Sequence, residues 1–365
     1  MPRIDSFLKL GLAQGCSDVH LAVGVPPMLR MHGDLMPIKF RDLSDTELEN
    51  YVMEILTDSQ KAHFASGRDL DFSYVGEDGG RFRVNLFRKD TGVGAVFRHI
   101  PNEVPTLQKL QMPPVVRDFC DYHQGMVLVT GSTGTGKSTT LAAMIDHLNK
   151  TRSLNIISLE DPIEFVHPSK NCQVIQRELG THLTSFADGV RSAMREDPDV
   201  ILVGELRDAE TISMAMTAAE TGHLVLGTLH TTSAVKTIDR VVDALPGELR
   251  EQTKSFLAQS LKAVVTQVLV KTPDGRGRKA VLEILINNRA ISKLIMSDQS
   301  HQIPAQLQTG RDVGMQLMDQ ALFAAIEANE VDPDDAFRYA SDKKKFKRFV
   351  TDTGILPTLD MDEAS

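Results

Sequence analysis

The segment Gly131-Ser132-Thr133-Gly134-Thr135-Gly136-Lys137-Ser138 decides the fold of this 365-residue chain. Its spacing, GxxxxGKS/T, is typical of a loop whose glycines let successive backbone N–H groups surround a phosphate. An apolar run at 126–130 precedes the loop, and apolar side chains follow it at helical spacing over 141–148. In this strand–loop–helix context, Lys137 is expected to reach the β- and γ-phosphates and the Ser138 hydroxyl to ligate Mg²⁺. The segment therefore predicts a site for ATP and Mg²⁺, formed by Ser132, Thr133, Gly134, Thr135, Gly136, Lys137, Ser138 and Thr139.

The remainder of this region predicts an α/β fold. Apolar runs at 126–130, 154–159, 199–204 and 224–229 alternate with stretches of helical spacing. Strands that are apolar on both faces and alternate with helices indicate a parallel sheet covered on both sides. After them we expect a hairpin formed by strands at 264–270 and 280–286. Three helices are then expected, at 291–296, 314–328 and 334–339.

The first hundred residues predict a separate, small α+β domain. Ser44 followed by Glu47 is a capping-box pattern that marks a helix start, and the glycines at 79–80 mark a hairpin turn. The expected elements are helices at 4–14 and 44–56, strands at 17–22, 28–31, 35–40, 69–75, 81–87 and 94–100, and a turn at 32–34.

A proline cluster separates the two regions. Pro101, Pro105, Pro113 and Pro114 fall within 14 residues, and proline stiffens a chain and prevents regular pairing. The expected organisation is an N-terminal domain at 1–100, a linker at 101–114, an ATPase domain with C-terminal helices at 115–350, and a disordered tail at 351–365.

Composition excludes several classes of protein. With 40 Lys and Arg against 49 Asp and Glu the net charge is −9, which disfavours sequence-independent binding to nucleic acid. Three scattered cysteines, Cys16, Cys120 and Cys172, cannot form a disulfide framework or a four-cysteine zinc site. No apolar run is long enough to cross a bilayer and the N-terminus lacks a signal-peptide pattern, so we expect a cytoplasmic location.

Acidic residues follow two of the predicted strands. Glu160, Asp161 and Glu164 come after the second strand and Glu205 after the third. The carboxyl ends of parallel strands meet at one edge, so these acids are expected near the phosphate loop, where they can orient water or hold metal-bound water. The alternative is that they cap helices. The usual strand-end Asp is replaced by Gly204, so Glu205 is expected to act through water.

Two histidines flank the fourth strand, His223 before it and His230 after it. We expect both to take part in the site, because strand ends at this edge are functional, and a structural role is the alternative.

Four ordered boxes resemble a known family: the phosphate loop, ISLEDPIEFVH (157–167), VILVGELRD (200–208) and ETGHLVLGTLHT (220–231). Together they resemble the secretion ATPase superfamily of the GspE/PilT type, and most closely the PilT type of pilus retraction ATPase. The resemblance implies an N-terminal PAS-like domain, a RecA-like ATPase domain and a hexameric ring. It also implies Glu164 as general base, Glu205 as the Walker B glutamate, and His223 and His230 as the histidine box.

The same resemblance implies that arginines of the N-terminal domain close over the nucleotide. The matching positions are Arg83 and Arg98, with Arg81 and Arg88 as weaker candidates. An arginine there spreads positive charge over the transferring phosphoryl group, and the alternative is that these arginines form salt bridges within the sheet.

The resemblance implies a retraction motor for twitching motility that acts on an inner-membrane platform protein, at the inner face of the cytoplasmic membrane. The motif AIRNLI of the family reads Ala290-Ile291-Ser292-Lys293-Leu294-Ile295 here, which leaves a PilU-like accessory role open. Three alternatives remain: an extension or type II secretion ATPase, which the three scattered cysteines disfavour; a nucleotide-regulated scaffold; and a nucleic-acid translocase, which the net charge of −9 disfavours. The basic run at 343–348 suggests peripheral contact with anionic lipid, or simply a solvated helix face.

Overall fold

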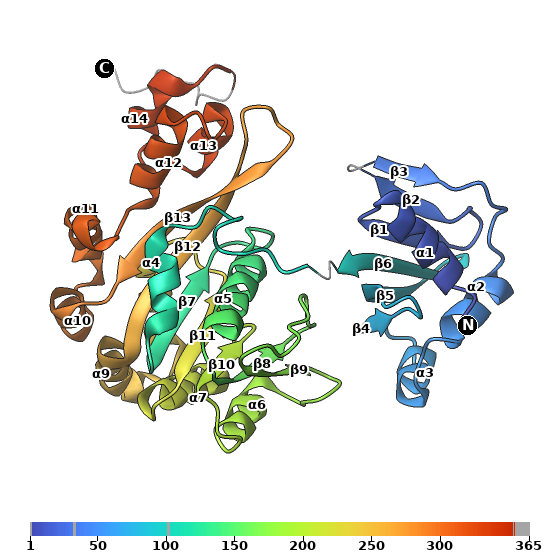
Figure 1. Ribbon diagram of the computed structural model, residues 1–365, viewed down its shortest axis with the longest axis horizontal. Helices are drawn as coiled ribbons and strands as arrows, with labels where there is room; N and C mark the ends of the chain where they lie inside the picture. The colour runs from blue at the N-terminus through green and yellow to red at the C-terminus, as the bar shows by residue number, and fades with distance from the viewer. Residues whose placement is uncertain (1, 32–33, 101–102, 353, 355–365) are drawn as a thin grey trace, which may run out of the picture. The chain divides into compact units, whose positions relative to one another are not determined.

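The computed structural model describes residues 2–31, 34–100, 103–352 and 354, which divide into two compact units. The first unit contains residues 1–104 with 162–166, and the second contains 105–161 with 167–365 (Figure 1). The predicted turn at 32–34 falls mostly outside the described residues, as do Pro101 and nearly all of the predicted tail.

The first unit is an antiparallel six-stranded sheet with helices on one face (Figure 1). Its strand order is β3-β2-β1-β6-β5-β4. Leu21, Phe97 and Leu86 point from this sheet into a core shared with the helices. The elements are α1 (Asp5–Gln14), β1 (Asp18–Ala22), β2 (Met28–Met31), β3 (Asp34–Pro37), α2 (Asp45–Met53), α3 (Asp58–Ala65), β4 (Leu70–Val75), β5 (Arg81–Lys89) and β6 (Gly92–Ile100).

Most of the predicted elements of this unit are confirmed, with three differences. The strand expected at 35–40 ends at Pro37, which has no N–H to continue the pairing. Helix α3 is absent from the sequence-based expectations, because only Phe64 of its eight residues is buried and it has no apolar stripe. The capping box at Ser44 is half formed: the Ser44 hydroxyl accepts the Glu47 N–H, but the Glu47 carboxylate pairs with Arg41 instead of the cap backbone.

The second unit is built on a seven-stranded sheet of order β13-β12-β7-β11-β10-β8-β9. All neighbours in it are parallel except β12 and β13, which form a hairpin. Its strands are β7 (Gly125–Thr130), β8 (Asn155–Glu160), β9 (Gln173–Glu178), β10 (Val200–Val203), β11 (Leu224–Leu229), β12 (Leu261–Lys271) and β13 (Arg278–Ile286). The α/β class and the four apolar parallel strands are thus confirmed.

Helices cover both faces of this sheet (Figure 1). Alternate side chains of β7 enter different cores: Met126 and Leu128 face one, Val127 and Val129 the other. The second core holds α4 (Pro114–Asp118) and α5 (Lys137–Thr151). The first core holds α6 (Phe186–Ala193), α7 (Ala209–Glu220), α8 (Ala234–Ala244), α9 (Arg250–Ser260), α10 (Arg289–Met296) and α11 (Ile303–Thr309).

Three C-terminal helices, α12 (Met318–Glu327), α13 (Pro333–Tyr339) and α14 (Lys343–Phe346), pack on the outer part of the β12–β13 hairpin. The prediction of a helix over 314–328 is wrong for its first turn, since α12 begins only at Met318. Gly314 has φ 92°, and Gln316 pairs with Ile284 of β13 instead. In the basic run, the Lys343 ammonium donates to backbone carbonyls of α13 and the Arg348 guanidinium lies over the Phe323 ring.

Within the described part of the chain, every helix is too short or too polar to span a bilayer.

Candidate functional site

The phosphate loop connects β7 to α5 in a conformation that requires glycine. Gly131, Gly134 and Gly136 have φ of 142°, 80° and 87°, values that residues with a Cβ rarely adopt. A Cβ at Gly131 would also lie 2.4 Å from the carbonyl oxygen of Gln267. The loop ends where α5 begins at Lys137, so the N-terminal N–H groups and partial positive charge of this helix face the loop.

Lys137 is buried and held inside the loop. Its Nζ donates to the carbonyl oxygens of Gly131 and Ser132 at 2.9 and 3.0 Å. The Thr135 hydroxyl donates to the same Ser132 carbonyl at 2.9 Å, whereas the Ser138 side chain is exposed. The loop therefore places a fixed positive charge beneath a rim of exposed hydroxyls and N–H groups, an arrangement suited to a polyphosphate.

Strand β12 braces this loop, which the sequence-based expectations miss. The Gln267 amide donates to the Thr135 carbonyl at 2.6 Å and accepts the Thr140 hydroxyl at 2.8 Å. The hydroxyls of Thr266 and Thr130 hydrogen-bond at 2.9 Å. The only signal in the sequence is a polar pair within the apolar run 263–270, and it becomes meaningful once β12 is known to lie beside β7.

Glu205 and His230 meet at the carboxyl ends of the strands, where the phosphate loop also lies. Strand β11 lies between β7 and β10, so the residues that follow these three strands are neighbours. The Glu205 carboxylate lies 3.5 Å from Nε2 of His230, and both side chains are partly exposed. The Thr228 hydroxyl donates to the carbonyl of Gly204 and links β11 to the turn before Glu205.

His223 lies at the amino ends of the strands, away from the phosphate loop. This corrects the expectation that both histidines lie at the carboxyl ends, where the nucleotide is expected. Its neighbour Leu224 pairs with Gly125, at the start of β7, whereas Leu229 pairs with Thr130 at its end. Nδ1 of His223 lies 2.9 Å from the Ala218 carbonyl, near the end of α7. Within one chain, His223 is therefore not part of the group around Lys137.

The acidic segment begins at the edge of the sheet. Glu160 ends β8, and its Oε1 accepts the Ser158 hydroxyl at 2.7 Å and the Gln176 amide at 3.0 Å. Asp161 and Glu164 are exposed. Glu164 lies within 162–166, the segment that groups with the first unit, and its role as general base stays a prediction.

The predicted arginines lie on the first unit's sheet. Arg83 and Arg98 are directly opposite each other in β5 and β6, and Nε of Arg98 donates to Asp18 at 2.9 Å. Burial alone would raise the pKa of Asp18, but hydrogen bonds from Arg98 and Ser17 outweigh it and lower the pKa. The salt-bridge alternative thus applies to Arg98.

The two weaker candidates, Arg88 and Arg81, differ in the contacts that their side chains make. Arg88 lies 3.8 Å from Glu49 and over the Phe64 ring. The buried Nε of Arg81 has no hydrogen-bond partner among the residues that the structure describes.

A cavity of about 430 Å³ adjoins the phosphate loop within the second unit. Gly136, Thr139 and Thr140 line one side, and the turn at 109–112 and the β12–β13 hairpin line the others. Its volume is within the range of small-molecule sites. Apolar side chains such as Met112 and Leu269 share the wall with polar ones.

Three of the polar side chains in this wall contact one another in a chain. Gln111, which has φ 53°, accepts the Lys279 ammonium on its amide oxygen at 3.0 Å, and Lys279 lies 2.7 Å from Glu330. A non-glycine residue held at positive φ is often found where a ligand is bound.

Across the described residues no three His, Cys, Asp or Glu side chains are arranged to hold a metal ion by themselves. Mg²⁺ does not require such a cluster, because it binds through one or two protein oxygens, water and the phosphates of its nucleotide. The exposed Ser138 hydroxyl at the start of α5 fits that mode of binding.

Comparisons with known proteins agree along nearly the whole chain. A family model described as "Type II/IV secretion system protein" matches residues 12–332. The chain is 47% identical to the "Type IV pilus retractation ATPase PilT" of Pseudomonas aeruginosa, over 94% of this chain and 99% of that one. It is 38% identical to the "Type IV pilus ATPase PilU" of the same organism, over 93% and 88%. A crystal structure of the pilus retraction motor PilT with bound ADP superposes with a TM-score of 0.88, at 40% identity and over 94% and 99% of the two chains.

Proposed function

The chain belongs to the type II/IV secretion system protein family, and we propose that it hydrolyses ATP as the motor that retracts type IV pili. The observation that supports this most is the meeting of the phosphate loop with Glu205 and His230 at one sheet edge. This arrangement accompanies 47% identity to a PilT protein over almost the full length of both chains.

Different groups of the loop bind the phosphates and the Mg²⁺ ion of the nucleotide. The N–H groups of the loop and the ammonium of Lys137 hold the β- and γ-phosphates, and the hydroxyl of Ser138 holds Mg²⁺. When bound, Mg²⁺ neutralises charge on the phosphates. The ribose and base occupy the cavity next to Thr139, between the 109–112 turn and the hairpin.

The carboxylates position the attacking water. Glu205, beside His230, orients water at the γ-phosphate, and Glu164 is the general base that takes its proton. Arg83 and Arg98 supply positive charge to the transferring phosphoryl group, which requires Arg98 to leave Asp18. His223 acts outside this group.

The same proposal includes the larger assembly. The first unit is a PAS-like domain and the second a RecA-like ATPase domain, and six copies form a ring. The ring works from the cytoplasmic face of the inner membrane on a platform protein of the pilus machinery. The resemblance and the full-length match to PilT support these points.

Steady-state ATP hydrolysis tests the enzymatic part. Lys137→Ala is expected to lower kcat more than about 100-fold, since it removes a fixed charge from the phosphates. Lys271→Ala, an exposed lysine of β12, is the matched control and is expected to keep wild-type turnover. Equal turnover in the two variants would contradict the proposal.

Deletion of the gene in its host tests the direction of work. A retraction motor predicts more surface pili and no twitching motility, restored by the wild-type gene and not by Lys137→Ala. Loss of pili would indicate an extension motor instead.

An accessory, PilU-like role is the second candidate, because of the replaced motif at 290–295. In the structure the Ser292 hydroxyl donates to the Ala258 carbonyl at 2.7 Å, while Lys293 is exposed. The higher identity to PilT, 47% against 38% to PilU, favours the motor itself. Motility that survives the deletion would favour the accessory role.

A further inference from the structure

We propose that Gln176 of β9 is a positioning residue that closes the acidic loop, residues 161–166, and thereby fixes its carboxylates for ATP hydrolysis. The inference rests on the proposed function and assigns a new role within the same site. Gln176 lies on the edge strand of the sheet, at the side opposite to the β12–β13 hairpin, and is not part of the phosphate loop.

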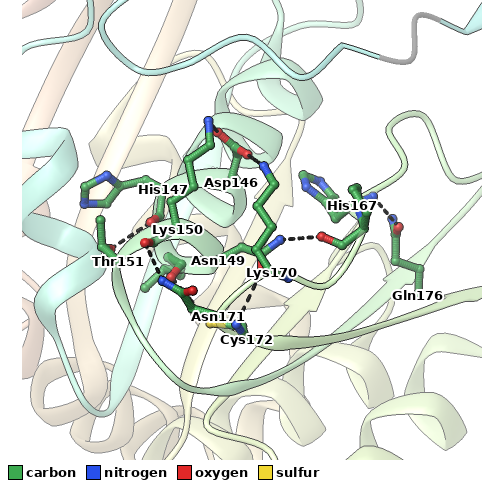
Figure 2. Close-up of polar contacts among 12 residues, drawn as sticks. Asp146, His147, Asn149, Lys150, Thr151, His167, Lys170, Asn171, Cys172 and Gln176 are labelled. Atoms are coloured by element: carbon green, nitrogen blue, oxygen red, sulfur yellow. Dashed lines mark hydrogen bonds and ion pairs between the residues drawn. The ribbon is translucent and has the colours of Figure 1, made fainter.

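Gln176 binds both ends of the acidic loop with one amide group. Its Nε2 donates to Oε1 of Glu160, the residue before the loop, at 3.0 Å. Its Oε1 accepts the backbone N–H of His167, the residue after the loop, at 2.8 Å (Figure 2). Because the amide is planar and rigid, these two bonds hold the ends of the loop at a set separation.

The register of the sheet orients this amide. Gln176 pairs with Ser158 of β8, so its side chain shares a face with Ser158 and with Glu160, two residues further on. The Ser158 hydroxyl donates to the same Glu160 oxygen at 2.7 Å. The first end of the loop is therefore fixed by two donors from neighbouring strands.

The second end of the loop is fixed to the helix that follows the phosphate loop. Asn149 of α5 donates to the Pro168 carbonyl at 2.8 Å and accepts the Lys170 N–H at 2.9 Å (Figure 2). The Lys170 ammonium reaches back to Asp146 of the same helix at 2.8 Å. The segment after His167 is thus tied to α5, whose first residue is Lys137.

His167 lies between these two attachments and stays uncharged. It is buried, and burial lowers its pKa to about 4. At neutral pH its ring therefore places no positive charge beside the acidic loop.

Fixed ends matter because the loop contains Glu164, the proposed general base. A catalytic group works only within a narrow range of positions, and a displacement of about 1 Å costs up to roughly 100-fold in rate. Loss of the Gln176 amide would break the direct link between the two ends of the loop, with each end still held separately by Ser158 and Asn149 and with the phosphate loop and Lys137 unchanged.

The test substitutes Gln176→Met, which keeps the length of the side chain and removes its amide. The matched control is Gln173→Met, at the exposed start of the same strand. We expect kcat of Gln176→Met to fall about 10- to 100-fold, while KM for ATP stays within about twofold. An unchanged kcat, or a loss that appears equally in the control, would overturn the inference.

A second variant distinguishes positioning from general damage. In a Glu164→Ala background, Gln176→Met is expected to cause no further loss of kcat, since the group that it positions is gone. Additive losses, or full activity of Glu164→Ala alone, would contradict the proposed role.

Hydrogen exchange gives a readout that does not depend on turnover. The His167 amide is expected to exchange faster in Gln176→Met than in wild type or in Gln173→Met. Unchanged exchange would overturn the inference even if the protein hydrolysed no ATP, whereas failure of wild-type turnover alone would overturn only the proposed function.

Discussion

At the residue scale, the contact between Glu205 and His230 is the most informative in the site. Glu205→Gln keeps the size of the side chain and removes the carboxylate that orients water, so we expect kcat to fall about 100-fold or more with ATP binding retained. Glu220→Gln, an exposed acid at the far end of α7, is the matched control. Tight binding with undiminished turnover would remove Glu205 from the chemistry.

His167 predicts a pH dependence of stability. The unfolded chain protonates this histidine near its ordinary pKa of 6.5, whereas the folded chain does so only near 4. Its contribution to the free energy of unfolding is therefore complete above pH 6.5 and declines as pH falls toward 4, by about 3 kcal/mol. His167→Gln should lose less stability over this range than wild type or the exposed control His301→Gln, measured by urea unfolding at each pH.

At the element scale, Glu283 of β13 joins two helices. Its buried carboxylate accepts the N–H of Ala234 at 2.7 Å, which begins α8, and that of Met318 at 3.3 Å, which begins α12. Burial raises the pKa of Glu283. Glu283→Ala would leave two buried N–H groups without an acceptor, so we expect unfolding to become easier by about 2–5 kcal/mol. Glu283→Gln should lose less, and equal losses in urea would show that the acceptor is unimportant.

Elements with a strong local pattern could be predicted from the sequence, and those defined by tertiary partners could not. The strand at 126–130 and the loop after it are apparent from composition and spacing alone. Strand β9 reads QVIQRE, a half-exposed edge strand with no apolar alternation, so nothing in its own residues identifies it. The positions of His223 and Gln267 follow from register, which the spacing of a single sequence does not contain.

At the scale of the whole molecule, the cavity beside the phosphate loop connects nucleotide binding to the chain segment that leads from the first unit. The turn at 109–112 forms one of its walls and lies within the proline-rich segment, between Pro105 and Pro113. A base bound there would contact this turn, so occupancy by nucleotide would be transmitted to the start of the second unit. This is how a motor would couple chemistry to movement between its units.

Lys279→Met tests that coupling, because it breaks the contacts with Gln111 and Glu330 while the phosphate loop stays intact. We expect KM for ATP to rise about tenfold with little change in kcat, the result of losing binding that substrate and transition state share. Inhibition by tripolyphosphate, which has no base, should be unaffected, and the amides of 109–112 should no longer gain protection when ATP binds. Lys271→Met, on the same hairpin, should behave as wild type. If the variant weakened the binding of ATP and of tripolyphosphate equally, the base would lie elsewhere. The linker would then make no direct contact with the nucleotide.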